Sequence, residues 1–324
     1  MLRLPNNNVP TTSIGIGCAY LTEVFGLSRE SAVIDVAYEA GARHFDVAPQ
    51  YGLGTAEKML GIALQGRRTS VTVSTKVGIL PRNASSAELL LRALASPVRG
   101  LLRGRRNLTV NSYNTSSATR YARNYEPSYV NKTLESSLRS LRTDYVDAWL
   151  LHMISLEELS DELLSCLLKC RREGKTRAIG LATTREETGR IVNAFPGVFD
   201  LVQYAWSALD EPIVHQPGGP FLITHRALMR AYGPLVAWFA SNPEACRRLS
   251  DVTGMDLFDR KRLSATLVGA AVAANPTGIG LVASRSVERT KLNIEAAQDP
   301  LVVSAGKRFT DALRDEEKKP SSPS

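Results

Sequence analysis

The sequence has no long apolar run. Its 324 residues are 44% hydrophobic, but no stretch approaches the roughly 18 consecutive apolar residues of a membrane-spanning helix. The first residues, Met1–Asn6, lack the apolar core of a secretory signal peptide. We therefore expect a soluble, cytoplasmic protein that does not associate with a membrane.

Cysteine is also scarce, and its spacing does not match that of a metal site. The chain has four cysteines, at Cys18, Cys166, Cys170 and Cys246. Cys166 and Cys170 stand four residues apart on an expected helix, where buried thiols are more common than a redox or metal-binding pair. We predict that the protein holds no metal.

The chain is basic, with a formal net charge of +8 and a pI of about 9.4. Such a balance raises the possibility of nucleic-acid binding, but the excess is gathered in one segment rather than spread over a face. We predict no nucleic-acid partner and interpret residues 80–124 as a long basic loop. Its arginines include Arg92, Arg99, Arg103, Arg105, Arg106, Arg120 and Arg123.

Strand-like and helix-like patterns alternate along the chain, which predicts a parallel sheet built from βα units. Eight strand candidates fit an α/β fold of the (β/α)8 TIM-barrel type, a single domain over residues 1–314 with a disordered tail at 315–324. A doubly wound Rossmann fold is the alternative. The strands are expected at Ser13–Cys18, His44–Ala48, Val71–Val77, Tyr145–Leu151, Arg177–Ala182, Leu201–Trp206, Phe221–Leu228 and Gly280–Ser284.

Helical spacing of apolar residues predicts seven helices, the last of which closes the fold. Gly15–Gly17 lacks the third glycine of the dinucleotide fingerprint, so we interpret it as a tight turn that ends the first strand. The proline- and glycine-rich stretch Pro212–Pro220 leaves no room for a regular helix. The helices are expected at Ser31–Ala40, Thr55–Leu64, Pro127–Leu141, Leu156–Arg172, Glu186–Ala194, Lys261–Ala274 and Val287–Ala297.

Four reactive side chains stand at or just after strand ends: Asp46, Tyr51, Lys76 and His152. In a parallel barrel the carboxyl ends of the strands meet around one mouth, so these residues can share a site. Each alone is more often a surface or packing residue. Together they suit proton transfer to or from an oxygen, because the carboxylate and ammonium can lower the pKa of the phenol while the imidazole orients a carbonyl.

The segment Gly41–Gly52 resembles the signature of the aldo-keto reductases. Ser74–Lys76, Asp147–His152 and Lys175–Gly180 follow in the order of that family, and the likeness runs from Gly15 to Ala297. It implies a (β/α)8 barrel that binds NAD(P)H across its C-terminal face. It also implies that Tyr51 is the general acid/base, that Lys76 and Asp46 tune it, and that His152 places the substrate oxygen.

Within the family, Val73–Gly78 and Tyr129–Leu141 are similar to the sugar 1-dehydrogenase branch, which oxidises aldoses to lactones. Trp206 is a large ring near the expected mouth, where we predict a wall of the substrate pocket. Core packing is an equal alternative for this side chain.

The resemblance also implies the cofactor contacts. Thr183 and Gln203 stand where the family holds the nicotinamide carboxamide, and His225 stands where a tyrosine stacks on the ring. Ser284 and Arg289 match the positions that face the 2′-phosphate, and Asn293 matches the adenine contact. A guanidinium near a helix N-terminus suits a phosphate monoester, so NADP(H) is favoured over NAD(H).

The sequence therefore predicts an NAD(P)-dependent oxidoreductase that acts on a small aldehyde, ketone or aldose. Ala182 and Thr183 replace a serine and an asparagine of the family, which keeps a non-catalytic NADP(H)-binding regulatory or sensor subunit as the alternative. For the basic loop, a solvated insertion is favoured over a site that attracts an anionic substrate.

Overall fold

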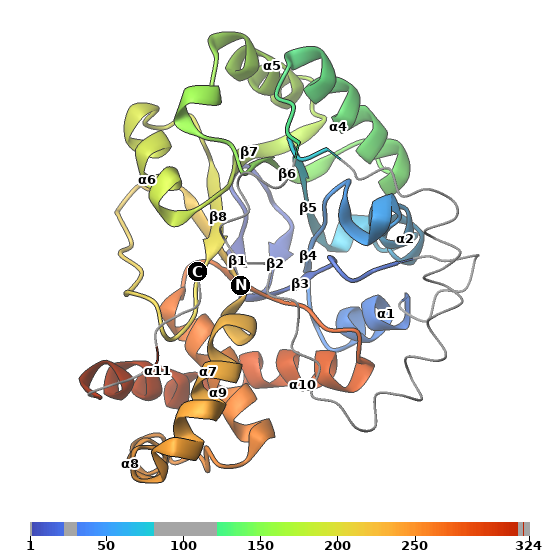
Figure 1. Ribbon diagram of the computed structural model, residues 1–324. Helices are drawn as coiled ribbons and strands as arrows, with labels where there is room; N and C mark the ends of the chain where they lie inside the picture. The colour runs from blue at the N-terminus through green and yellow to red at the C-terminus, as the bar shows by residue number, and fades with distance from the viewer. Residues whose placement is uncertain (1, 23–30, 81–121, 317–319, 321–324) are drawn as a thin grey trace.

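Eight parallel strands close into a barrel (Figure 1). The computed structural model describes residues 2–22, 31–80, 122–316 and 320. The closed ring confirms the predicted (β/α)8 architecture and excludes the open Rossmann sheet. In ring order the strands are β10 (Ile279–Val282), β3 (Ile14–Gly17), β4 (His44–Asp46), β5 (Thr72–Val77), β6 (Val146–His152), β7 (Thr176–Ala182), β8 (Leu201–Ala205) and β9 (Phe221–His225).

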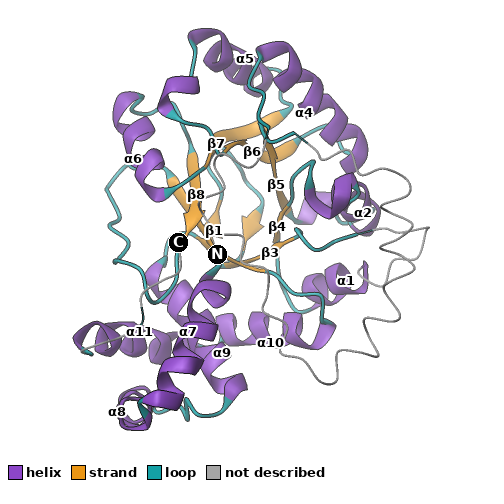
Figure 2. Ribbon diagram, viewed as in Figure 1, coloured by secondary structure: helices purple, strands orange, loops and turns teal. Residues whose placement is uncertain are grey.

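Helices surround the barrel, as the colouring by secondary structure shows (Figure 2). All seven predicted helices are present, with shifted ends in most cases. They are α1 (Ser31–Glu39), α2 (Ala56–Ala63), α4 (Pro127–Leu141), α5 (Asp161–Arg172), α6 (Arg185–Ala194), α9 (Arg260–Ala274) and α10 (Val287–Gln298).

One of these predicted helices is interrupted near its start. The continuous helix over Leu156–Arg172 is instead a 3-10 turn, η4 (Leu156–Glu158), followed by α5. The break occurs because Ser160 caps α5, with its hydroxyl accepting the Leu163 N–H at 3.2 Å.

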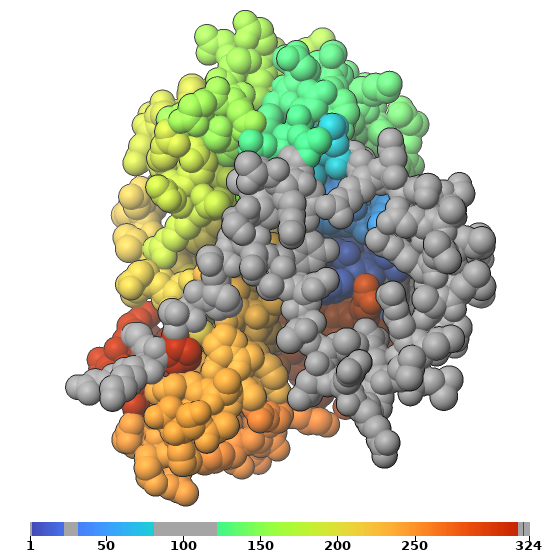
Figure 3. Space-filling model, in the orientation of Figure 1, coloured from blue at the N-terminus to red at the C-terminus, as the bar shows by residue number. Residues whose placement is uncertain are grey.

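Three further helices were not predicted: α7 (Ala227–Ser241), α8 (Pro243–Thr253) and α11 (Pro300–Asp315). Strand β9 was expected to continue to Leu228, but it ends at His225 and α7 follows. These helices pack with α9 around a second apolar cluster that includes Leu235, Phe239, Leu267 and Phe309. The α7–α8 segment, in orange, lies on the opposite side of the molecule from the green α4–α5 segment (Figure 3). No described helix is long and apolar enough to cross a membrane.

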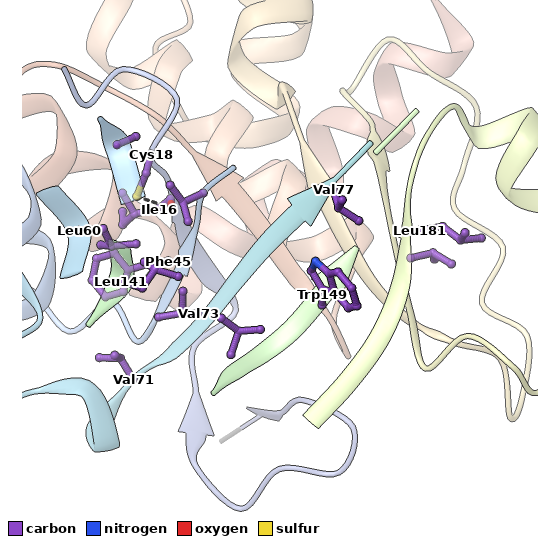
Figure 4. Close-up of a cluster of buried hydrophobic side chains, with 14 of the residues drawn as sticks. Ile16, Cys18, Phe45, Leu60, Val71, Val73, Val77, Leu141, Trp149 and Leu181 are labelled. Atoms are coloured by element: carbon purple, nitrogen blue, oxygen red, sulfur yellow. Dashed lines mark hydrogen bonds between the residues drawn. The ribbon is translucent and has the colours of Figure 1, made fainter. Parts of the chain in front are cut away.

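Side chains along the strands alternate between the helical shell and the barrel interior. The cluster that includes Phe45, Val73, Trp149 and Leu181 lies on the helical side (Figure 4). Inside, strands β6 to β10 contribute apolar residues such as Ala148, Leu150, Ala178, Leu201, Ile223 and Ile279.

Strands β4 and β5 differ, because their inward side chains are polar and buried. These are His44 and Asp46 on β4, and Thr72, Ser74 and Lys76 on β5. The register sets His44 beside Thr72 and Asp46 beside Ser74. A polar column therefore crosses the barrel interior along these two neighbouring strands.

Gly15 makes space for this column. A Cβ atom at Gly15 would lie 2.9 Å from the ring of His44 and 2.8 Å from Leu281. Residues Gly15–Gly17 belong to strand β3, so the interpretation of this segment as a tight turn was wrong. The missing side chain serves the packing of the interior.

An N-terminal hairpin, β1 (Leu2–Arg3) with β2 (Pro10–Thr11), covers the end of the barrel at which the strands begin. Its loop residue Asn7 donates a 2.6 Å hydrogen bond to the carboxylate of Asp147 near the start of β6. Asp147 is fully buried and also accepts the Val73 N–H at 2.8 Å. The guanidinium of Arg68 completes this cluster at 2.8 Å from the carboxylate.

We predict that Asp147→Asn lowers the free energy of unfolding by about 3 kcal/mol, because the Arg68 charge loses its buried partner. The exposed neighbour Asp144 is the matched control, and Asp144→Asn should change stability by less than about 0.5 kcal/mol. Urea unfolding of both variants measures the difference. Equal free energies of unfolding for Asp147→Asn and Asp144→Asn would show that the Asp147 cluster does not stabilise this end of the barrel.

Candidate active site

The structure brings the four predicted reactive residues to one end of the barrel. Asp46 is the last residue of β4, Lys76 stands next to the end of β5, and His152 is the last residue of β6. Tyr51 begins the 3-10 turn η1 (Tyr51–Gly54) that follows β4. Adjacent parallel strands thus present three of the groups, and a short turn carries the fourth over them.

Lys76 and Asp46 form a buried ion pair. The ammonium lies 2.7 and 2.6 Å from the two carboxylate oxygens and donates to Val47 O at 3.1 Å. Burial favours the neutral form of each group, but the opposite charge and the hydrogen bonds outweigh it. The pKa of Asp46 is therefore lowered and that of Lys76 raised, so both are charged at neutral pH.

Hydrogen bonds along the polar column support the Asp46 carboxylate. Ser74 Oγ donates to Asp46 Oδ1 at 2.7 Å and lies 3.3 Å from His44 Nε2. Burial lowers the pKa of His44 to about 4, so the ring is neutral and has one N–H. Nδ1 of the ring lies 3.0 Å from the hydroxyl oxygen of Thr72, which donates its own hydrogen to Arg43 O at 3.0 Å.

Tyr51 lies over this ion pair. Lys76 Nζ is 5.1 Å from the centroid of the Tyr51 ring. Burial raises the pKa of the phenol, Lys76 lowers it and Asp46 raises it; the result lies above the usual value. The sequence predicted that both Lys76 and Asp46 lower the pKa of the phenol, but of these two charges only Lys76 lowers it. Tyr51 is thus protonated at neutral pH and ready to donate.

The backbone after Tyr51 requires glycine. Gly52 has φ +58°, and a Cβ atom there would lie 1.7 Å from Leu21 O. No side chain fits this contact, and the left-handed backbone also favours glycine. The turn therefore holds the phenol over the strand ends.

His152 faces Tyr51, with ring centroids 6.4 Å apart and the planes at 86°. Burial, followed by the charge of Lys76, lowers the pKa of His152 to about 3. The imidazole is therefore neutral, so it can donate one hydrogen bond and accept another.

Two residues that the sequence did not indicate as site residues hold the end of β6. Tyr125 Oη donates to His152 O at 2.7 Å, and Arg123 donates to Met153 O at 2.7 Å. Arg123 also pairs with Ile79 in an antiparallel bridge. Residues 81–121 of the predicted basic loop lie outside the described residues, so its proposed attraction of an anionic substrate stays a prediction.

The predicted carboxamide contacts lie on β8 and after β7. Gln203 is 3% exposed, and its Oε1 has no hydrogen-bond partner among the described residues. An amide with an unpaired buried oxygen fits the N–H of a carboxamide. Thr183 donates its hydroxyl hydrogen to Ile154 O at 3.1 Å, so toward a carboxamide it can only accept. His225 ends β9, and burial lowers its pKa to about 3.

The predicted phosphate and adenine contacts lie at the start of α10. Ser286 caps this helix by accepting the Arg289 N–H at 3.3 Å, and the Arg289 side chain is exposed. Ser284 precedes the cap, and Asn293 is buried on the same helix. A helix N-terminus with an exposed guanidinium fits a phosphate group.

Trp206 is 1% exposed and packs with Ala227 and Ala271. Its Nε1 donates to Glu211 O at 3.1 Å. This placement favours the packing alternative, and a role in the pocket wall stays a prediction. Among the described residues, no cluster of histidine, cysteine and acidic side chains is arranged to hold a metal ion.

Comparison with known proteins decides the family. The model of the aldo/keto reductase family matches residues 13–216. The chain belongs to the aldo-keto reductase family. The resemblance carried by Gly41–Gly52 is thereby confirmed.

The chain is also similar to individual proteins. The aldo-keto reductase yakc [NADP(+)] of Schizosaccharomyces pombe is 29% identical over 58% of this chain and 46% of its own length. A D-threo-aldose 1-dehydrogenase of a Pseudomonas species is 32% identical over 53% of this chain and 50% of its own. The matched part thus spans about half the length of these two relatives.

Among solved structures, an aldo-keto reductase of Klebsiella pneumoniae in complex with NADPH aligns with a TM-score of 0.63. It is 19% identical and covers 99% of this chain and 97% of its own. At this level of identity the likeness shows the shared barrel fold.

The neutral histidines around the site predict a loss of stability in mild acid. The pKa values of His44, His152 and His225 are about 4, 3 and 3, against about 6.5 in an unfolded chain. Between pH 6.5 and 4 the unfolded state therefore binds more protons. As the pH is lowered through this range, the free energy of unfolding should decrease by up to about 1.4 kcal/mol per pH unit for each histidine.

Urea unfolding at a series of pH values between 7 and 5 measures this slope. His44→Gln keeps a polar side chain but cannot titrate, so it should remove the share of one histidine. A slope that is the same in the variant and the wild type would contradict a neutral, buried His44.

Proposed function

We propose that this aldo-keto reductase is an NADP-dependent oxidoreductase that interconverts a carbonyl and an alcohol. The observation that carries the proposal is the placement of the Tyr51 ring, 5.1 Å from Lys76 Nζ and 6.4 Å from the ring of His152. This arrangement provides an acid, a cation that stabilises its conjugate base, and a hydrogen-bond donor for the reacting oxygen.

In carbonyl reduction, bound NADPH supplies the hydride. Tyr51 Oη donates its proton to the substrate oxygen, and His152 donates a hydrogen bond to the same oxygen. The Lys76 ammonium stabilises the tyrosinate that forms, while Asp46 keeps Lys76 charged and in place. In alcohol oxidation the tyrosinate accepts the proton, and the same groups act in reverse.

The preference for NADP(H) rests on Arg289. Its guanidinium lies in the first turn of α10, where it would face the 2′-phosphate that NAD(H) lacks. Gln203 and Thr183 would hold the carboxamide, His225 would lie against the nicotinamide, and Ser284 and Asn293 would complete the adenosine end. The relative from S. pombe, whose name specifies NADP(+), supports this choice.

An aldose is the substrate class that we favour among aldehydes, ketones and sugars. The similarity to a D-threo-aldose 1-dehydrogenase supports it, together with the likeness of Val73–Gly78 to that branch. A non-catalytic NADP(H)-binding subunit is less consistent with the site, because such a protein has no need of a buried Asp46–Lys76 pair beneath Tyr51.

Tyr51→Phe should lower turnover by about 10²–10⁴-fold, because the phenyl ring cannot transfer the proton. NADPH binding, followed by cofactor fluorescence, should stay close to that of the wild type. Tyr232→Phe, a half-buried tyrosine on α7, is the matched control and should keep full turnover. A screen of aldoses and aldehydes supplies the substrate. Undiminished turnover of Tyr51→Phe would disprove the mechanism.

Arg289→Gln should weaken NADPH binding by about 10–100-fold, as expected for the loss of a charge-assisted hydrogen bond. NADH binding should hardly change, since NADH has no 2′-phosphate. The neighbouring Lys291→Gln, which removes another exposed charge of the same helix, controls for general electrostatics. If Arg289→Gln weakens both cofactors equally, Arg289 does not recognise the 2′-phosphate.

A further inference from the structure

His152 has a polar contact besides those of the proposed proton transfer. Gln50, the residue directly before Tyr51, places its Nε2 2.9 Å from Nδ1 of His152. The two residues are 102 positions apart in the chain. Tyr51 N donates to Ala48 O at 3.0 Å, and this turn carries Gln50 and Tyr51 together over the strand ends.

The contact determines where the imidazole holds its hydrogen. An amide nitrogen donates hydrogen bonds and does not accept them, so Nδ1 of His152 must be the acceptor. A neutral ring that accepts at Nδ1 has its hydrogen on Nε2. Among the described residues, Nε2 of His152 has no hydrogen-bond partner in the protein.

We propose that Gln50 is a positioning residue that holds His152 in the Nε2–H tautomer. In this form the imidazole donates toward the oxygen to which Tyr51 transfers its proton. In the other tautomer Nε2 has a lone pair, which would repel the carbonyl oxygen instead of polarising it. The inference rests on the proposed function for its catalytic meaning, but the tautomer itself is a property of the free protein.

The same turn thus serves two groups of the site. It presents Tyr51 as the acid and, through the preceding side chain, orients the ring that faces it 6.4 Å away. Tyr125 acts on the other side of His152 by holding its carbonyl oxygen. The backbone contact fixes the position of the strand end, whereas the Gln50 contact selects between the tautomers.

The direct test is long-range ¹H–¹⁵N NMR on full-length protein with ¹⁵N-labelled histidine, near neutral pH. The His152 signals are assigned by their loss in His152→Asn. We expect the Nε2–H pattern in the wild type. Gln50→Leu removes the donor and should give a mixture of tautomers, while Gln50→Glu, an acceptor, should move the hydrogen to Nδ1 or protonate the ring. Gln65→Leu, at an exposed glutamine, should leave the pattern unchanged.

A wild-type Nδ1–H pattern would overturn the proposal, since the amide oxygen of Gln50 would then face the ring. An unchanged pattern in Gln50→Leu would overturn it as well. These readings do not depend on turnover, so they are distinct from a failure of the proposed function, which Tyr51→Phe tests.

Kinetics then connect the tautomer to the reaction. Gln50→Leu should lower kcat by about tenfold, within the range that a misplaced catalytic hydrogen bond costs, with an unchanged Kd for NADPH. Gln50→Glu should add an ionisation to the pH profile of kcat, because a carboxylate raises the pKa of the neighbouring imidazole. A merely structural role of Gln50 would add no such ionisation, and a profile without it would contradict the proposal.

Discussion

The buried ion pair between Asp46 and Lys76 is the interaction on which the site depends. Two charges removed from water are stable only if they are close and their remaining hydrogen-bonding groups are satisfied. The barrel meets both conditions. Neighbouring strands β4 and β5 bring the ammonium within 2.7 Å of both carboxylate oxygens, and Ser74 and Val47 O bind the remaining groups. Gly15 provides the space that the column beneath the pair requires.

The chemistry of the mouth follows from this one concentrated charge pair. Lys76 lowers the pKa of Tyr51 against the effect of burial, and its charge helps to keep His152 neutral. The result is a neutral acid and a neutral donor beside a fixed cation. Such a set transfers a proton and stabilises the anion left behind. Because His152 is neutral and has one ring hydrogen, Gln50, an uncharged residue, can control the direction of the His152 hydrogen bond.

Much of this could be predicted from the sequence. The strands were recognised by their apolar runs, and the four reactive residues by their places at strand ends. The β1–β2 hairpin was missed because two-residue strands carry no periodic pattern. The start of α7 was missed because the apolar run Phe221–Leu228 was interpreted as one strand, although β9 ends at His225. The contacts of Gln50 and Tyr125 with β6 join residues 102 and 27 positions apart, which local patterns cannot show. For Trp206 the sequence allowed two roles, and burial favours packing.

The central claim is that the Lys76 charge holds down the pKa of Tyr51. It can be measured by NMR titration of protein labelled with ¹³Cζ-tyrosine, in the wild type and in Lys76→Met, with Tyr51→Phe to assign the signal. The account predicts that the pKa of Tyr51 rises in Lys76→Met, since burial and the unpaired Asp46 then act without the opposing charge of Lys76. A pKa that stays the same or falls would contradict it.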